Sequence, residues 1–505
     1  MRSGGSSAGV LDREHRRTTV GLLTLVTLIA FEAMAVGTAM PSAVTELGGL
    51  AWYAWPFSAF LVASVVGMVL GGEAGDRRGA RTALPLGVAV FAAGLLVAGS
   101  AGAMAVLVVG RAVQGLGAGV MVVLLYVIAG QAFAPALRPR LFGAISAAWV
   151  LPALVGPLVA GLVTTHAGWR WVFLGLLPLV LVGLLLVVSA GRRHAAVVGD
   201  GALAAAHDGT SAGAGERGAS AGAGERISER RGTASTTSGA GAGVRTGRAR
   251  WALLAGLGIA ALQYAGQRLD LPALAVAAAG IAALAAGLRR LLPRGTARAA
   301  RGLPAVIASR GLLAGAFFGM DALIPLTLTA VHGYEPTAAG LPLTAGAIGW
   351  ALASHLQGRR PDLPRERVLR AGFVLLALGL AGTVLAALPA FGGWPVYLSW
   401  TVAGLGMGLG MPSVGVLLLD QSPEDTRGEN SAALQIADVT ASALCIGLAG
   451  VLVAAATAGA FSLPLAVVGA IVGLTAVALV GVRVAGRAAA PPREASARRA
   501  TTLAR

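Results

Sequence analysis

The sequence has no lysine, one cysteine and few charged residues. All 39 cationic residues are arginine, so the lysine of a Walker A nucleotide loop and the lysine amine of a Schiff-base enzyme are both absent. The single cysteine, Cys445, excludes a disulfide within the chain, and the six histidines show no metal-ligand spacing. We therefore expect no cofactor, no metal site and no hydrolysis of ATP by this chain.

Apolar residues are abundant instead. Of 505 residues 56 % are hydrophobic and 12 % are charged, which is too apolar for soluble domains of this length. Since a membrane span needs about 20 mostly apolar residues, fourteen stretches qualify as candidate spans. They lie near 18–43, 51–71, 82–101, 104–130, 141–164, 170–190, 251–267, 271–288, 306–331, 338–357, 368–388, 394–419, 431–456 and 462–482. The seventh and eighth are short and rich in alanine, so a count of twelve stays open.

Arginines collect in alternate loops between these spans. Arg77, Arg138 and Arg289 belong to one set of loops, whereas the other set has only Arg170 and Arg268, both at span ends. Because short cytoplasmic loops hold the positive excess, this asymmetry predicts a multi-pass protein of the cell membrane with both termini in the cytoplasm. The net charge of +17 is thereby explained by topology, and we expect a lipid bilayer and no nucleic acid as partner.

A segment of different composition divides the spans into six and eight. Residues 195–250 are rich in Gly, Ala, Ser, Thr and Arg, and the unit SAGAGER occurs twice in them, which predicts a disordered linker. The expected order is a cytoplasmic N-terminal tail at 1–17, a six-helix bundle at 18–194, the linker at 195–250, an inserted helix pair at 251–288, a second six-helix bundle at 302–484 and a cytoplasmic tail at 485–505. The fold class is an all-α integral membrane protein.

The last six spans repeat features of the first six. Residues 114–119 and 404–410 place closely spaced glycines in spans four and twelve, and each span is followed by a Pro, an Arg and a Ser-Ala-Ala sequence, at 135–148 and 423–433. Duplicated six-helix halves are typical of transporters, in which the substrate site lies between the halves at mid-membrane. The helix pair at 251–288 is then an insertion.

The loop after span two has the pattern G-x-x-x-D-R-x-G-x-R, formed by Gly72, Asp76, Arg77, Gly79 and Arg81. The glycines permit a tight turn, and the aspartate can pair with guanidinium groups and cap a helix. This pattern resembles the cytoplasmic loop of the major facilitator superfamily, which implies a latch between two conformations. The alternative is a set of ordinary loop charges that obey the positive-inside rule.

Span four contains an arginine, Arg111, in a stretch that resembles the second motif of this superfamily, in which the arginine is associated with proton transfer. An arginine inside a span costs about 2.5–3.5 kcal/mol on insertion scales, so it normally has a partner or a polar cavity. The alternative is that its side chain extends to the membrane surface.

Span five contains Pro152, Gly156, Pro157 and Gly161. Small residues let helices approach closely and prolines bend them. This stretch is similar to the motif of the drug:proton antiporter branch, except that Ala160 stands where glycine is usual, and the resemblance implies export. A packing site unrelated to transport direction is the alternative.

Three acidic residues lie within spans. Glu32 and Asp321 lie at matching depths in spans one and nine, the first spans of the two halves, and Asp438 lies in span thirteen. A carboxyl group away from water readily holds a proton, so each could bind either a proton or a cation. The fourteen-helix drug antiporters usually have an acid in helix one, which implies that Glu32 is the proton or cation site. For Asp321 a structural hydrogen bond is an equal alternative, and for Asp438 a pair with a loop arginine is favoured.

Taken together, these residues and the resemblance imply a secondary transporter that exports a lipophilic drug or secondary metabolite in exchange for protons by alternating access. We expect a monomer whose partners are a small-molecule substrate, protons and lipid. An importer, by symport or facilitated diffusion, remains the main alternative, and a membrane sensor or scaffold is the next. A membrane enzyme is disfavoured because the sequence shows no cluster of catalytic residues at one membrane face.

Overall fold

The computed structural model describes residues 12, 15–133, 137–189, 238–268, 270–360, 362–424 and 426–489, in which all regular secondary structure is helical. The first half contains α1 (Arg16–Glu46), α2 (Trp55–Arg78), α3 (Ala80–Gly99), α4 (Met104–Ala132), α5 (Arg138–Ala167) and the span Arg170–Ser189, which starts with α6 (Arg170–Leu174). The second half contains α10 (Leu303–Asp321), α11 (Leu323–His332), α12 (Pro336–Gly358), α13 (Arg365–Ala387), α14 (Pro395–Gln421), α15 (Arg427–Thr457) and α16 (Leu463–Ala485). Short 3-10 helices are η1 (Leu50–Trp52), η2 (Thr296–Arg298) and η3 (Pro389–Phe391). The prediction of an all-α membrane protein is confirmed.

Twelve helical segments of the described residues are long and apolar enough to cross a membrane. The helices α8 (Ser238–Gly266) and α12 are not among them, although they contain 29 and 23 residues. The count of fourteen spans therefore stays a prediction.

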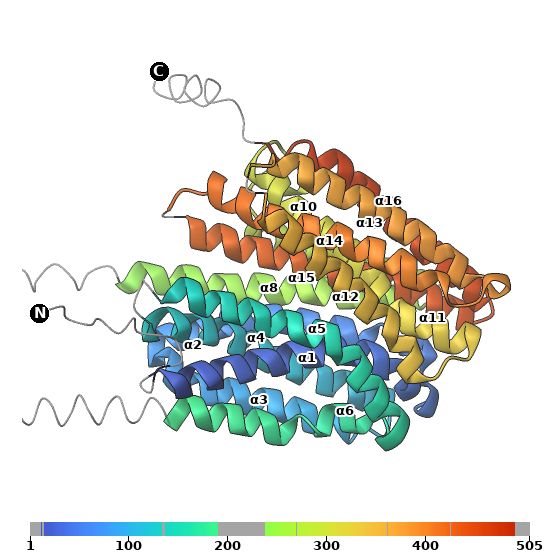
Figure 1. The fold of residues 1–505 in the computed structure, drawn as a ribbon, viewed down its shortest axis with the longest axis horizontal. Coiled ribbons are helices and arrows are strands. Elements are labelled where there is room, and N and C mark those ends of the chain that lie inside the picture. The colour runs from blue at the N-terminus through green and yellow to red at the C-terminus, as the bar shows by residue number, and fades with distance from the viewer. Residues whose placement is uncertain are drawn as a thin grey trace, which may run out of the picture.

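The two halves form two groups of helices, and α8 runs between them (Figure 1). It packs against α9 (Leu271–Leu291) and also contacts α2 of the first half and α15 of the second. Val65, Ala252 and Val439, one from each of α2, α8 and α15, form one apolar cluster. The inserted pair thus bridges the halves.

The start of α8 differs from the predicted boundary, because residues 238–250 of the expected linker are helical. The rest of that linker, and most of the two predicted tails, lie outside the described residues.

Span nine differs from the single helix predicted at 306–331. Here α10 ends at Asp321 and α11 begins at Leu323, with Ala322 between them. Pro325 has no N–H to donate to the Asp321 carbonyl four residues earlier, so the helical hydrogen-bond ladder is interrupted at the acidic residue. The predicted coupling acid therefore lies beside a break in the backbone.

Closely spaced glycines bring helices into contact within each half. In α4, a Cβ at Gly115 would lie 2.8 Å from the carbonyl carbon of Phe60 in α2, and one at Gly117 would lie 2.6 Å from the Cα of Phe91 in α3. In α14, Gly404 approaches Gly346 of α12, with 3.0 Å between such a Cβ and the Cα of Gly346. The two glycine series therefore serve the same packing role in both halves, which supports the predicted duplication.

A methyl group at Gly115 is expected to destabilise the protein, because it would press on the backbone of α2 and not on a flexible side chain. We expect Gly115→Ala to lower the free energy of unfolding by about 1–3 kcal/mol. Gly130→Ala, in the same helix, is the matched control because a Cβ there meets nothing within 4 Å. Unfolding followed by circular dichroism in detergent measures both variants, and equal midpoints would contradict the backbone contact.

Candidate functional site

A cavity of about 1340 Å³ lies between the two halves. Its walls come from α1, α2, α4 and α5 on one side and from α10, α12, α14 and α15 on the other. It reaches the end of α2 at Asp76 and the start of α15 at Gly428 and Glu429, where all three residues are exposed. The cavity therefore opens on the side of the α2–α3 turn, called here the near side, and the opposite side is the far side.

Most of the cavity wall is apolar or aromatic. The aromatic residues are Phe57, Phe60, Tyr126, Trp149, Phe318 and Trp350, and the methionines are Met34, Met68 and Met411. The charged residues are Glu73, Asp76, Arg111, Arg310, Asp321, Glu429 and Asp438. Such a wall suits a lipophilic molecule and offers few fixed charges to bind it.

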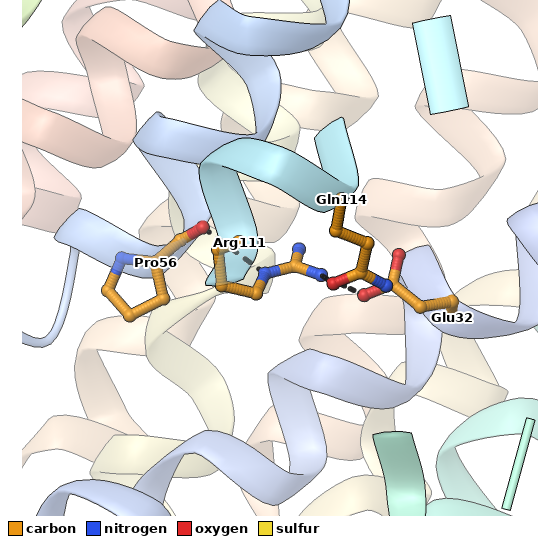
Figure 2. A network of polar contacts seen from close by, with 4 residues as sticks. All are labelled: Glu32, Pro56, Arg111 and Gln114. Atoms are coloured by element: carbon orange, nitrogen blue, oxygen red, sulfur yellow. Dashed lines mark hydrogen bonds and ion pairs between the residues drawn. The ribbon is translucent and has the colours of Figure 1, made fainter. Parts of the chain in front are cut away.

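Glu32 and Arg111, predicted separately, form one ion pair between α1 and α4. Figure 2 shows the guanidinium group between the carbonyl of Pro56 and the carboxylate of Glu32. Its Nη1 donates to Glu32 Oε1 and, at 2.7 Å, to Gln114 Oε1, and its Nε donates to the Pro56 oxygen at 3.3 Å. The guanidinium carbon also lies 4.3 Å from the centre of the Phe60 ring.

The pair is removed from solvent, since Glu32 is 0 % and Arg111 is 2 % exposed. The alternative in which Arg111 extends to the membrane surface is therefore wrong. Glu32 Oε2 and Gln114 Nε2 have no hydrogen-bond partner in the described structure. Buried charges are tolerated when they neutralise each other, so each partner makes the burial of the other possible.

Asp321 is in a different environment from Glu32. It lies at the end of α10, is partly exposed and lines the cavity, and Glu32 is not among the lining residues. No ion pair among the described residues includes Asp321. The indole of Trp400 in α14 lies nearby, but its Nε1 has no hydrogen-bond partner in the described structure. The cavity wall thus contains, in Asp321, a carboxyl group that forms no ion pair in the described part of the chain.

Asp438 pairs with an arginine that the sequence analysis did not name. Arg310 of α10 donates to Asp438 Oδ2 from Nε at 2.8 Å and from Nη2 at 2.5 Å. The expectation of a loop arginine as partner is wrong, because Arg310 lies inside the helix. The signal was available, since Arg310 lies within predicted span 306–331 and an arginine in a span needs a partner.

The predicted near-side loop is a one-residue turn. Gly79 has a φ of 81° and separates the end of α2 at Arg78 from the start of α3. Arg77 Nη2 lies 3.7 Å from Glu73 Oε2 in the same helix. The N-cap of α3 is Gly79, whereas Asp76 lies in the last turn of α2 at the cavity mouth, and its expected role as a helix cap stays a prediction.

The other two residues of the loop pattern do not pack tightly. A Cβ at Gly72 would meet nothing within 4 Å, and Arg81 is half-buried in the first turn of α3. The pattern therefore explains the turn, and its role as a latch stays a prediction.

The proline-glycine stretch of α5 lies where the halves meet on the far side. Gly161 faces Thr337 of α12, so that a Cβ on it would lie 3.0 Å from the Thr337 nitrogen. Gly340 of α12 in turn faces Thr38 and the carbonyl of Pro157, each about 2.9 Å from such a Cβ. These contacts close the far side, with backbone against backbone between α5 and α12 and with the Thr38 side chain of α1 against the backbone of α12.

The rest of that stretch packs within the first half. A Cβ on Gly156 would lie 3.4 Å from Met34 Cβ of α1, and Pro152 and Pro157 both lie inside α5. Gly156, Pro157 and Gly161 thus join α5 to α1 and α12, away from the cavity mouth.

The Glu32–Arg111 pair leads to a stability prediction. Arg111→Met would leave a buried carboxylate without its counter-charge, and we expect the free energy of unfolding to fall by about 3–5 kcal/mol. Replacing both charges, with Glu32→Met and Arg111→Met together, should recover most of that loss. Chemical unfolding in detergent distinguishes the two variants. Equal stability of the single and double variants would show that the counter-charge does not offset the free-energy cost of burying these two side chains.

Comparisons with known proteins identify the family. The sequence pattern of the Major Facilitator Superfamily matches residues 22–320 and 306–504. A probable multidrug-efflux transporter of Mycobacterium tuberculosis is 28 % identical over 477 residues, which cover 90 % of this chain and 91 % of that protein. The multidrug transporter protein MdtP of Bacillus subtilis is 31 % identical over 182 residues, but these cover only 36 % of this chain and 33 % of that relative.

Solved structures agree on the fold. An auto-inhibited peptide transporter of the POT family superposes with a TM-score of 0.64 at 16 % identity, over 94 % of this chain and 98 % of the other. A D-xylose-proton symporter superposes with a TM-score of 0.54 at 16 % identity, over 86 % and 89 %. At this identity the likeness concerns the fold alone. The family match covers most of the sequence, and the chain belongs to the Major Facilitator Superfamily.

Proposed function

We propose that this protein is a secondary active transporter that exports lipophilic, cationic compounds in exchange for protons. The observation that carries the proposal is the large apolar cavity, open on one side only, with the unpaired acid Asp321 in its wall. In this proposal the near side faces the cytoplasm, as the arginine distribution predicts.

The size and lining of the cavity support a substrate of drug size. Pockets for such ligands usually enclose about 300–1,000 Å³, so a cavity of about 1340 Å³ leaves room for molecules of different shape. Aromatic and methionine side chains adapt to varied apolar surfaces and attract cations through their rings. A substrate that is both apolar and positively charged would use the wall and Asp321 together.

The two mid-membrane acids then have different tasks. Asp321 faces the cavity, so it can hold either a proton or the cationic group of a substrate, but not both. Glu32 does not line the cavity and is buried against Arg111, which does, and protonation of Glu32 would release that arginine from its counter-charge. Competition between a proton and the cationic substrate for Asp321 couples the two movements. The Glu32–Arg111 pair is proposed to change its protonation in the first half when the occupant of Asp321 changes.

The names of the relatives and the position of α5 support export as the direction of transport. A relative that covers nine-tenths of the chain is named a probable multidrug-efflux transporter, and MdtP is named a multidrug transporter. The proline-glycine stretch that resembles the antiporter motif closes the far side of the cavity. Both observations favour export over proton-coupled import on the same fold.

The proton gradient is a sufficient energy source. A membrane potential supplies about 2.3 kcal/mol per charge for each 100 mV, and about 1.4 kcal/mol corresponds to a tenfold concentration ratio. One exchanged proton per substrate can therefore maintain a substantial substrate gradient without ATP.

Transport by purified protein tests the role of the acids. Ethidium efflux from proteoliposomes under an imposed pH gradient should be lost in Asp321→Asn and in Glu32→Gln, because neither variant can complete the proton exchange. Asp420→Asn is the matched control, since Asp420 is an exposed acid at the end of α14 that does not line the cavity. Wild-type pH dependence in both mid-membrane variants would overturn the proposal, and proton movement in the same direction as ethidium would indicate import.

The far-side seal leads to a separate prediction. Gly161→Leu would place a side chain into the backbone of α12, and overpacking of this kind costs about 1–3 kcal/mol. We expect the ratio of far-side-closed to far-side-open protein to fall by about tenfold, the equivalent of about 1.4 kcal/mol. Gly473→Leu is the control because a Cβ on Gly473 meets nothing within 4 Å.

Spin labels on the far side measure this ratio. Gly102→Cys lies between α3 and α4 of the first half, and Ala460→Cys lies between α15 and α16 of the second, and both residues are exposed. In a Cys445→Ala background, the distance between the two labels should lengthen in Gly161→Leu and stay at the wild-type value in Gly473→Leu. An unchanged distance in both variants would show that α5 does not seal the far side.

A further inference from the structure

A short turn of the first half reaches across to the second half beside Asp321. It comprises residues 50–54, namely η1 followed by Tyr53 and Ala54, and it connects α1 to α2 on the far side. Tyr53 is 1 % exposed, and its hydroxyl donates to the Ala322 carbonyl oxygen at 2.5 Å. This hydrogen bond joins residues 269 positions apart, one from each half.

The acceptor is the residue between α10 and α11. Asp321 directly precedes it, and Pro325 interrupts the helical ladder at the same point. The Tyr53 hydroxyl of the first half therefore binds the backbone carbonyl of the residue that directly follows Asp321. A movement of Asp321 would therefore displace the acceptor of the Tyr53 hydrogen bond.

The same turn makes further contacts on the far side. Ala54 packs with Ala322 and Ile446 in one apolar cluster, so the turn also contacts α15. Gln267, which follows α8, donates from Nε2 to the Ala51 carbonyl at 3.2 Å. The contacts with α10–α11 and α15 join the two halves, so they can form only while the far side is closed.

We propose that Tyr53 is a positioning residue that links the protonation of Asp321 to closure of the far side. This inference rests on the proposed function of Asp321. When the acid is neutral, the Tyr53 hydroxyl stays on the Ala322 carbonyl, as observed, and the far side is held closed. An ionised carboxylate is the stronger acceptor and draws the hydroxyl away, which weakens the contact between the halves and favours opening of the far side.

Other ionisable groups near Asp321 do not provide this link. Cys445 of α15 packs against Gly315 and Gly319 of α10. Trp400 of α14 has no ionisable group. Tyr53 therefore joins Asp321 to the opposite half.

Two further charged pairs contribute residues to the wall of the cavity that Asp321 lines. Arg310–Asp438 lies between α10 and α15 of the second half, and Glu32–Arg111 lies between α1 and α4 of the first. Each pair balances its own charge within one half. A pH-dependent change at the contact between the halves is therefore assigned to Asp321 and Tyr53.

Removal of one hydroxyl tests the inference. With the far-side label pair at 102 and 460, wild-type protein should be mostly far-side-closed at low pH and should open as the pH rises. Tyr53→Phe should lower the closed-to-open ratio at low pH by about fivefold, the effect of one neutral hydrogen bond, and should weaken its pH dependence. Tyr53→Met, which also lacks the hydroxyl, serves if the phenylalanine variant does not elute as folded protein.

The chain offers a matched control in Tyr397→Phe. The Tyr397 hydroxyl donates to the Ala338 carbonyl at 3.4 Å, but both residues belong to the second half. Its removal should leave the ratio and its pH dependence at wild-type values. If Tyr53→Phe behaves like Tyr397→Phe, the inference about Tyr53 is wrong.

Asp321→Asn separates this failure from failure of the proposed function. A permanently neutral side chain should keep the far side closed at every pH while Tyr53 is present. If Asp321→Asn retains the wild-type pH dependence, the proposed role of Asp321 is wrong, whatever Tyr53→Phe does. If Asp321→Asn removes that dependence and Tyr53→Phe changes nothing, only the link through Tyr53 is overturned.

Discussion

The cost of placing charge inside a membrane organises the centre of this protein. The three mid-helix acids meet this constraint in different ways. Glu32 is buried completely with Arg111, Asp438 is bound by Arg310, and Asp321 faces the cavity without an arginine partner. Because the first two charges are balanced where they lie, Asp321 is the one of the three that meets an entering proton or cation at the cavity wall without a counter-charge.

The positions of these pairs determine where the protein can move. Each arginine–acid pair joins helices of one half, and the glycine series of α4 and α14 lock neighbouring helices together in the same halves. The halves themselves meet through the contacts of α5 and α1 with α12, through α2 and the 50–54 turn against α15, and through the inserted helix α8. The structure thus has two firmly packed bodies and a limited seam between them, the arrangement that rocking of two bundles requires.

Much of this architecture could be predicted from the sequence, because it depends on local signals. Apolar runs located the helices, and the glycines of 114–119 and 404–410 indicated close packing in both halves. The acids were identified by their occurrence within spans. What the sequence could not show is the pairing of distant residues: Arg111 and Glu32 are 79 positions apart, and Arg310 and Asp438 are 128 apart. Pair partners depend on which helices become neighbours, and that information is spread over the whole chain.

The difference between Glu32 and Asp321 is a second case in which the sequence alone does not show which residues become neighbours. Both acids lie at matching depths in the first spans of the two halves. The resemblance implied that Glu32 is the proton or cation site, whereas Asp321 had a structural hydrogen bond as an equal alternative. The structure distinguishes them by their neighbours: α4 brings an arginine to Glu32, whereas a proline four residues after Asp321 opens the backbone and leaves the acid beside the cavity. In the proposed mechanism, the proton on Asp321 acts on the contact between the halves through the Tyr53 hydroxyl. An arginine partner at Asp321 would favour the ionised form of the acid, so that it would bind a proton or a cationic substrate less readily.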